Sequence, residues 1–160
     1  MTTFEMSDMG LMHYFLGMEV YQEGGIFISQ RKYALDLLNK FNMAECKSVA
    51  TPLIVNEKLK KEDGAKEADV VAYRSLIGSL LYLVTTRPNI MYATSLLSRF
   101  MQCPSQIHFG AAKRVLRYIQ GTKYFGICYK PSSHSTLTSF TDSDWAGYVD
   151  DIRSTSEYFF

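Results

Sequence analysis

Four aspartates near the carboxyl end of the chain are the residues whose spacing points most directly to chemistry. They lie within ten residues of one another, at Asp142, Asp144, Asp150 and Asp151. Carboxylates that converge on two divalent cations can activate a water molecule and stabilise the leaving oxygen in phosphodiester cleavage. Alternate residues of a strand share a face, so Asp142 and Asp144 together would hold one weakly bound ion at best. A two-metal site would need carboxylates from other elements.

A long basic stretch indicates a different chemistry, the binding of an anionic partner. Residues 70–141 contain eight Lys or Arg and neither Asp nor Glu, although the whole chain has 17 basic and 16 acidic residues. This segregation predicts a surface that faces an anion such as a nucleic-acid backbone. For Lys113, Arg114 and Arg117, an ordinary solvated helix face remains an alternative explanation.

Composition limits the class of protein. With 160 residues, of which 47% are hydrophobic, the chain can bury a core of its own, so a folded domain is expected. Three cysteines without C-x-x-C spacing argue against both a disulfide framework and a zinc site. The start of the sequence is acidic and no apolar run is long enough to span a membrane. We therefore expect an intracellular protein, cytoplasmic or nuclear, without a signal peptide or membrane contact.

The spacing of apolar residues predicts an α+β fold that begins with a β-hairpin and a helix. The hairpin would pair residues 13–21 with 26–29, and Ser29 would cap a helix that ends near Asn42. Gly17 lies inside the first of these strands, where a glycine favours close approach of another backbone or a ligand.

A central helical bundle and a C-terminal β-hairpin complete the expected fold. Apolar residues at three-to-four-residue spacing predict three packed helices in residues 70–121, the first of them capped by Asp69. Strands near 137–142 and 154–160 would pair in antiparallel fashion. The expected division of the chain is an N-terminal part, a solvent-exposed linker, a helical region and a C-terminal part, at residues 1–45, 46–69, 70–130 and 131–160.

Seven blocks of sequence together resemble one known family. They resemble, in this order, the Pol polyproteins of the Ty1/copia class of retrotransposons: HYFLGMEV at 13–20, SQRKYALDLLNKFNM at 29–43, TPL at 51–53, YRSLIGSLLYL at 73–83, TRPNIMYATSLLSRFM at 86–101, AAKRVLRYIQGT at 111–122 and FTDSDWAG at 140–147. The resemblance covers nearly the whole chain. It implies the carboxyl-terminal part of a reverse transcriptase, downstream of the catalytic palm motif, followed by the first hairpin of a truncated ribonuclease H-like domain.

The resemblance also implies roles for individual residues. Three residues would belong to the primer grip, the hairpin that holds the growing primer strand: Phe15, Leu16 and Gly17. Basic residues at the start of the thumb and in the connection would meet phosphates without reading sequence: Arg31, Lys32, Lys113, Arg114 and Arg117. Asp142 matches the first metal-binding, catalytic aspartate of ribonuclease H. Glu157 departs from the family, which usually has glycine there.

The implied cofactor and partners follow from the parent enzyme. The parent would use Mg²⁺, whereas no metal is expected for this chain alone because the other ribonuclease H carboxylates lie beyond Phe160. The implied partners are a primer–template or RNA–DNA hybrid and the remainder of the Pol polyprotein. We expect no polymerase or ribonuclease H activity from the chain by itself.

Two short strings invite other interpretations. Residues 148–151 spell Tyr-Val-Asp-Asp, the reverse-transcriptase catalytic tetrapeptide, but they follow Trp-Ala-Gly rather than an apolar strand. Residues 114–117 spell the R-x-L-R string of secreted oomycete effectors, but inside a predicted helix with no signal peptide before it. The alternatives to a Pol fragment are thus an independently expressed RNA- or DNA-binding module, and an interaction or effector-like protein.

Overall fold

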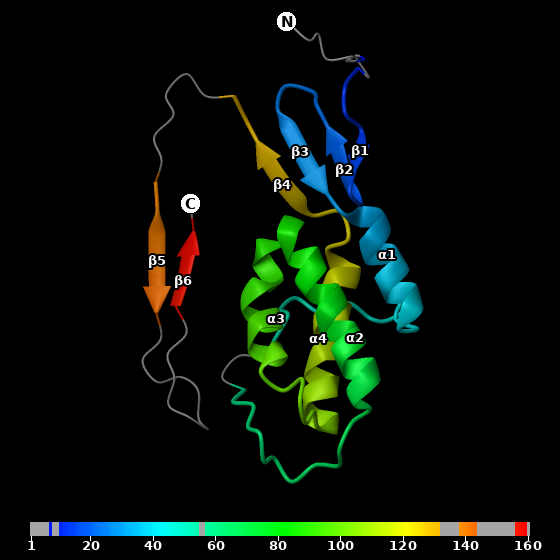
Figure 1. The fold of residues 1–160 in the computed structure, drawn as a ribbon, viewed down its shortest axis with the longest axis vertical. Helices are drawn as coiled ribbons and strands as arrows, with labels where there is room; N and C mark the ends of the chain where they lie inside the picture. Colours follow the sequence, from blue (N-terminus) through cyan, green and yellow to red (C-terminus); the bar gives the residue numbers. More distant parts are fainter. Residues whose placement is uncertain (1–6, 8–9, 55–56, 132–137, 144–155, 160) are drawn as a thin grey trace, which may run out of the picture.

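A four-stranded antiparallel sheet lies at one end of the helices (Figure 1). The computed structural model describes residues 7, 10–54, 57–131, 138–143 and 156–159. The strand order is β1-β2-β3-β4, with bounds Tyr14–Phe15, Met18–Tyr21, Ile26–Ser29 and Gly126–Tyr129. The expected hairpin is confirmed by the pairing of Val20 with Ile28. Strand β4 follows the last helix and pairs along β3, so residues far apart in sequence share this sheet.

The expected strand over 13–21 is interrupted, which corrects its predicted extent. Leu16 and Gly17 both have positive φ, 47° and 77°, and they form the turn of a two-residue hairpin between β1 and β2. Positive φ at both central positions is the geometry of a tight hairpin turn, and glycine adopts it without steric cost. Gly17 is thus a turn residue rather than a strand residue.

The start of helix α1 (Arg31–Lys40) also differs from expectation. Its N-cap is Gln30, whose side chain makes no capping bond, and Ser29 is buried and donates to Glu19 Oε2 at 3.3 Å. Glu19 Oε1 in turn accepts from the Lys32 amide at 3.2 Å. A carboxylate from strand β2 therefore accepts the amide that a Ser29 cap was expected to serve.

The helices between residues 70 and 121 confirm the predicted bundle. Asp69 caps α2 by accepting from the Val71 and Ala72 amides, as expected. Ser105 caps α4, whose N3 residue His108 reaches back to the Ser105 amide. The helical elements are α2 (Val70–Leu83), the 3₁₀ turns η1 (Val84–Thr86) and η2 (Pro88–Ile90), α3 (Met91–Ser98) and α4 (Gln106–Gly121).

The core lies among α1, α2, α3 and α4, which contact one another. Its fully buried members come mainly from the apolar stripes that predicted the helices: Leu37, Leu38, Tyr73, Leu76, Ile77, Leu80, Leu83, Ile90, Ala93, Leu97, Phe100, Ala112, Val115, Leu116 and Ile119. One α1 face and three central helices thus bury a single apolar cluster. In the part of the chain that the structure describes, no helix is long and apolar enough to cross a membrane.

The segment 46–69 is irregular, as expected, but it is not a freely exposed linker. Leu59 and Ala68 are buried, at 6% and 7% exposure. The Ala68 amide donates to Pro104 O at 2.8 Å, and the Gln106 amide donates to Lys66 O at 2.9 Å. The segment is therefore held against the start of α4. The predicted domain boundaries themselves stay a prediction.

A second, two-stranded sheet forms near the carboxyl end, from β5 (Phe140–Ser143) and β6 (Ser156–Phe159). The strands pair in antiparallel register, which confirms the expected C-terminal hairpin and makes Asp142 the partner of Glu157. The Tyr-Val-Asp-Asp string at 148–151 lies outside the described residues.

Candidate nucleic-acid interface

The turn predicted to belong to the primer grip is exposed at the sheet edge. Phe15 and Leu16 are 52% and 69% exposed. The Tyr82 hydroxyl, on α2, donates to Leu16 O, and a Cβ on Gly17 would lie 2.6 Å from that hydroxyl oxygen. The sequence motivated Gly17 by the approach of a nucleic-acid backbone, whereas the structure explains it by positive φ and contact with Tyr82. The exposed apolar pair is what remains available to a ligand.

Arg31 and Lys32 begin α1, close to the sheet. Both side chains are exposed. The Arg31 guanidinium lies over the ring of Tyr124, 4.5 Å from its centroid, and the Lys32 amide binds Glu19. Within the described residues neither charged head group donates a hydrogen bond, so their positive charges face solvent at the helix start.

The basic residues of α4 have a different environment. Arg114 donates from Nη2 to Thr51 Oγ1 at 3.1 Å, and Arg117 donates from Nε to Lys47 O at 2.8 Å. Both arginine side chains are half-buried rather than fully exposed. Lys113 is exposed and its ammonium lies 4.9 Å from the centroid of the Phe109 ring. The two arginines hold the 47–51 segment against the helix.

The predicted basic residues thus fall into two groups rather than one surface. Arg31 and Lys32 lie at the α1 start, whereas Lys113, Arg114 and Arg117 lie on α4. Arg114 and Arg117 of the second group donate hydrogen bonds to residues 51 and 47, in the irregular segment after α1. No hydrogen bond joins the two groups in the part of the chain that the structure describes.

Arg87 is a buried arginine that sequence reasoning did not single out. It is only 2% exposed, and it donates to Thr122 O at 2.9 Å, to Thr122 Oγ1 at 2.6 Å and to Asn89 Oδ1 at 3.2 Å. Burial lowers the pKa of Arg87. Its place just before Pro88, at the break between two helices, was the only signal in the sequence. Arg87 ties this break to the end of α4.

Arg74 follows the same pattern. Its Nε donates to Met101 O at 2.8 Å. Arg74, Arg87 and Arg117 therefore all use main-chain carbonyls as acceptors. Such bonds use guanidinium donors without cancelling the positive charge.

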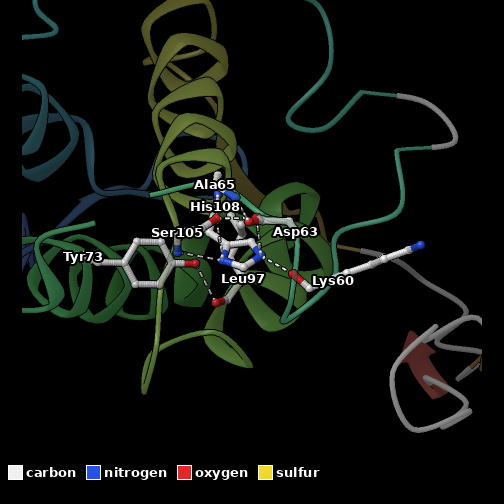
Figure 2. A network of polar contacts seen from close by, with 7 residues as sticks. All are labelled: Lys60, Asp63, Ala65, Tyr73, Leu97, Ser105 and His108. Carbon is white, nitrogen blue, oxygen red and sulfur yellow. Dashed lines mark hydrogen bonds and ion pairs between the residues drawn. The ribbon is translucent and has the colours of Figure 1, made fainter. Parts of the chain in front are cut away.

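A serine, a histidine and an aspartate meet at the start of α4, as Figure 2 shows. The Ser105 hydroxyl donates to Asp63, and the Ser105 amide donates to His108 Nδ1 at 3.0 Å. His108 Nε2 must then carry the proton, and it lies 2.9 Å from Lys60 O. The histidine therefore does not accept the serine proton, which a nucleophilic serine would require. This cluster is a helix cap that holds the 60–63 segment.

Titration of the cluster reflects the same contacts. The hydrogen bond from the Ser105 hydroxyl holds the pKa of Asp63 below its usual value, while partial burial opposes that shift. Tyr73, nearby in Figure 2, donates to Leu97 O at 2.8 Å, and burial raises its pKa. In the folded chain at neutral pH, the Asp63 carboxyl is therefore ionised and the Tyr73 hydroxyl keeps its proton.

The predicted metal ligand, Asp142, lies in β5 opposite Glu157. Among the residues described, no group of three or more His, Cys, Asp or Glu side chains is placed to hold a metal ion. The donors that two-metal chemistry requires are therefore not gathered in this part of the chain.

Comparisons with known proteins show which family the chain is similar to. Residues 1–55 match the model of the reverse transcriptase (RNA-dependent DNA polymerase) family. Retrovirus-related Pol polyproteins from the transposons RE2 and RE1 of Arabidopsis thaliana are 45% and 44% identical to it, over 92% and 97% of this chain. This chain spans only 10% and 11% of their lengths. No solved structure matches the chain significantly.

A third relative bears on the R-x-L-R string. A secreted RxLR effector protein of Plasmopara viticola is 43% identical over 91 residues, which is 56% of this chain and 64% of that protein. In the present structure Val115 and Leu116 of the string are fully buried in α4. The string is therefore part of a packed helix. The reverse transcriptase match and the two Pol relatives confirm the resemblance of the chain to the Pol polyproteins of copia-type retrotransposons.

Proposed function

We propose that the chain holds nucleic acid as a segment of a retrotransposon reverse transcriptase. The observation that carries this proposal is the exposed sheet edge beside two solvent-exposed basic side chains. Phe15 and Leu16 offer apolar surface, and Arg31 and Lys32 offer positive charge at the start of α1. An RNA–DNA hybrid presents phosphates and sugars to such a surface without requiring base recognition.

The electrostatics of the bundle support an anionic ligand. The stretch 70–141 has no carboxylate, and Arg74, Arg87 and Arg117 bind neutral oxygens. Their charges are therefore not cancelled by ion pairs within that stretch. The resulting positive field favours association with a polyanion, and it weakens as salt rises.

In this proposal the chain has no catalytic activity alone. The polymerase site and the further ribonuclease H carboxylates belong to the remainder of the Pol polyprotein, and Asp142 keeps its inherited position as first metal ligand. An assay of RNA–DNA hybrid cleavage with Mg²⁺ or Mn²⁺ should show no turnover by the isolated chain. Turnover that disappears in Asp142→Asn would contradict the proposal, because the chain would then complete its own metal site.

Salt-dependent binding tests the proposal. Affinity for a labelled RNA–DNA hybrid should fall steeply as salt rises, with little dependence on base sequence. A linear polyglutamate of similar charge serves as a control for attraction to any polyanion. Equal affinity for polyglutamate and hybrid at the same salt would reduce the interface to non-selective charge. Absence of hybrid binding at low salt would overturn the proposed function.

An independently expressed nucleic-acid-binding module is the second candidate. Its supporting observation is the shared core of α1, α2, α3 and α4, since a chain with one buried cluster has the means to fold without the remaining polyprotein. Cooperative thermal unfolding of the isolated chain, together with hybrid binding, would favour this candidate. Aggregation or non-cooperative unfolding would favour a segment that requires its polyprotein.

A further inference from the structure

Two adjacent aromatic rings are exposed on the connection between α4 and β4. Tyr124 is 61% exposed and Phe125 is 53% exposed. Single exposed apolar residues are normal on protein surfaces, but two neighbouring rings on a four-residue connection are a feature to explain. Neither ring was among the residues assigned to nucleic acid from the sequence.

The connection that carries these rings is fixed at both ends. The Phe125 amide donates to Thr122 O at 3.0 Å, and Thr122 is held by the buried Arg87 guanidinium. At the other end, Gly126 lies so close to Ile28 O that a Cβ there would overlap with it. The rings are therefore presented by anchored backbone rather than by a free loop.

Cations lie over both rings. The Arg31 guanidinium carbon is 4.5 Å from the Tyr124 centroid, and the Arg87 guanidinium carbon is 5.5 Å from the Phe125 centroid. The Lys123 ammonium is 5.9 Å from the Tyr124 centroid. More than half of each aromatic residue stays exposed beside these cations. Ring surface and positive charge are thus available together at one place.

This combination selects one class of ligand. A nucleic-acid strand carries flat bases that stack on aromatic rings and phosphates that attract cations, and such stacking is tolerant of base sequence. The neighbouring carboxylate, Glu19, already accepts from Ser29 and from the Lys32 amide. An apolar protein surface would leave the cations without partners. Bases inside a duplex are stacked on each other, so the ligand must be single-stranded.

We infer that Tyr124 and Phe125 form a stacking platform for unpaired bases, with Arg31 and Lys123 contacting the adjoining phosphates. The inference rests on the proposed nucleic-acid function and names a second ligand form, a single strand, at a site distinct from the β1–β2 turn. A base stacked on an aromatic ring contributes enough that losing it lowers affinity by about 5- to 150-fold.

The test compares a labelled thymidine oligonucleotide with an abasic strand of the same length and charge. The wild-type chain should bind the base-containing strand at least about fivefold more tightly. The double variant Tyr124→Leu/Phe125→Leu keeps apolar volume and removes the rings, so it should bind both strands equally, with the salt dependence of the wild type. Tyr92→Leu, an exposed tyrosine of α3, is the matched control and should keep the preference.

Equal binding of the two strands by the wild-type chain would overturn the platform, even if a variant fails to fold. If the RNA–DNA hybrid still binds with steep salt dependence in that case, the proposed function survives without this site. If the wild-type chain binds no nucleic acid, the proposed function and the stacking platform are both contradicted. Self-association that disappears in the double variant, without any preference between strands, would assign the rings to a protein contact and would also overturn the inference.

Discussion

The start of α1 and the middle of α4 carry similar basic residues in very different environments. Arg31 and Lys32 are exposed, and their charged groups donate no hydrogen bond to the residues that the structure describes. Arg114 and Arg117 are half-buried and bind Thr51 and the Lys47 carbonyl. Both pairs looked equivalent as residue types on predicted helices. The difference teaches that charge in a sequence predicts a field, whereas contact with a ligand depends on which head groups remain available.

The two environments nevertheless contribute to one electrostatic property. An arginine that donates a hydrogen bond to a neutral oxygen keeps its charge. The α4 arginines can therefore attract a polyanion at long range while holding the 47–51 segment in place. The α1 pair adds exposed head groups that donate no hydrogen bond to the described residues. Substitutions should separate stability effects from binding effects along this line.

Substitution of Arg87, a buried arginine, should cause the largest loss of stability. Arg87→Ala removes three hydrogen bonds and leaves Thr122 O and Asn89 without their donor. We expect a loss of about 3 kcal/mol in the free energy of unfolding, measured by urea denaturation. Arg87→Lys, which retains charge but not the planar fork, should recover only part of it. A loss smaller than about 1 kcal/mol would mean that water replaces the guanidinium there.

Loss of the α4 cap should be the next largest effect. Ser105→Ala removes the hydroxyl that accepts from the His108 amide and donates to Asp63. We expect destabilisation of about 1–2 kcal/mol by thermal or urea unfolding. Ser105→Thr keeps the hydroxyl and is the control. Equal stability of the Ala and Thr variants would show that the capping hydroxyl does not stabilise the fold.

The α4 arginines should give a smaller loss of stability. Arg117→Ala removes the bond to Lys47 O, and we expect about 1 kcal/mol of destabilisation in urea. Arg31→Ala, its counterpart on α1, should change stability by less than about 0.5 kcal/mol because its side chain is exposed. Reversal of this order would break the comparison between the two helices.

The pH dependence of the stability that Asp63 contributes should be the smallest of these effects. The Ser105 hydroxyl lowers the pKa of Asp63 in the folded chain. A carboxylate with a lowered folded pKa stabilises the fold above its unfolded pKa, and that contribution disappears as pH falls through the folded value. The difference in unfolding free energy between wild type and Asp63→Asn should therefore shrink below about pH 4. A difference that is independent of pH from 3 to 7 would show that the charge of Asp63 is irrelevant.

Much of the fold was predictable because it depends on local signals. Periodic apolar residues predicted the three central helices, and Asp69 predicted where α2 begins. The pairing of β3 with β4 was not predicted, because no local pattern specifies which distant strand completes a sheet. The Ser29 cap was wrong because Glu19, ten residues earlier, supplies the acceptor instead.

The candidate site was less predictable than the fold. Residue type identified the cations, and the family resemblance identified the turn at Phe15–Gly17. Neither could show that Arg114 and Arg117 would bind the 47–51 segment, because that segment has no regular structure from which to infer its path. Tyr124 and Phe125 were not singled out from the sequence, since exposure depends on what the remaining chain leaves uncovered.

Hybrid binding by two charge-matched variants tests the central claim most directly. Arg31→Ala combined with Lys32→Ala, and Arg114→Ala combined with Arg117→Ala, each remove two positive charges. The slope of log affinity against log salt falls by about 1 for each lost phosphate contact. We predict a clearly lower slope for the α1 pair and a smaller fall in slope, with lower stability, for the α4 pair. A slope that falls only in the α4 pair would contradict the account, because the bonded arginines would then be the ones that meet phosphate.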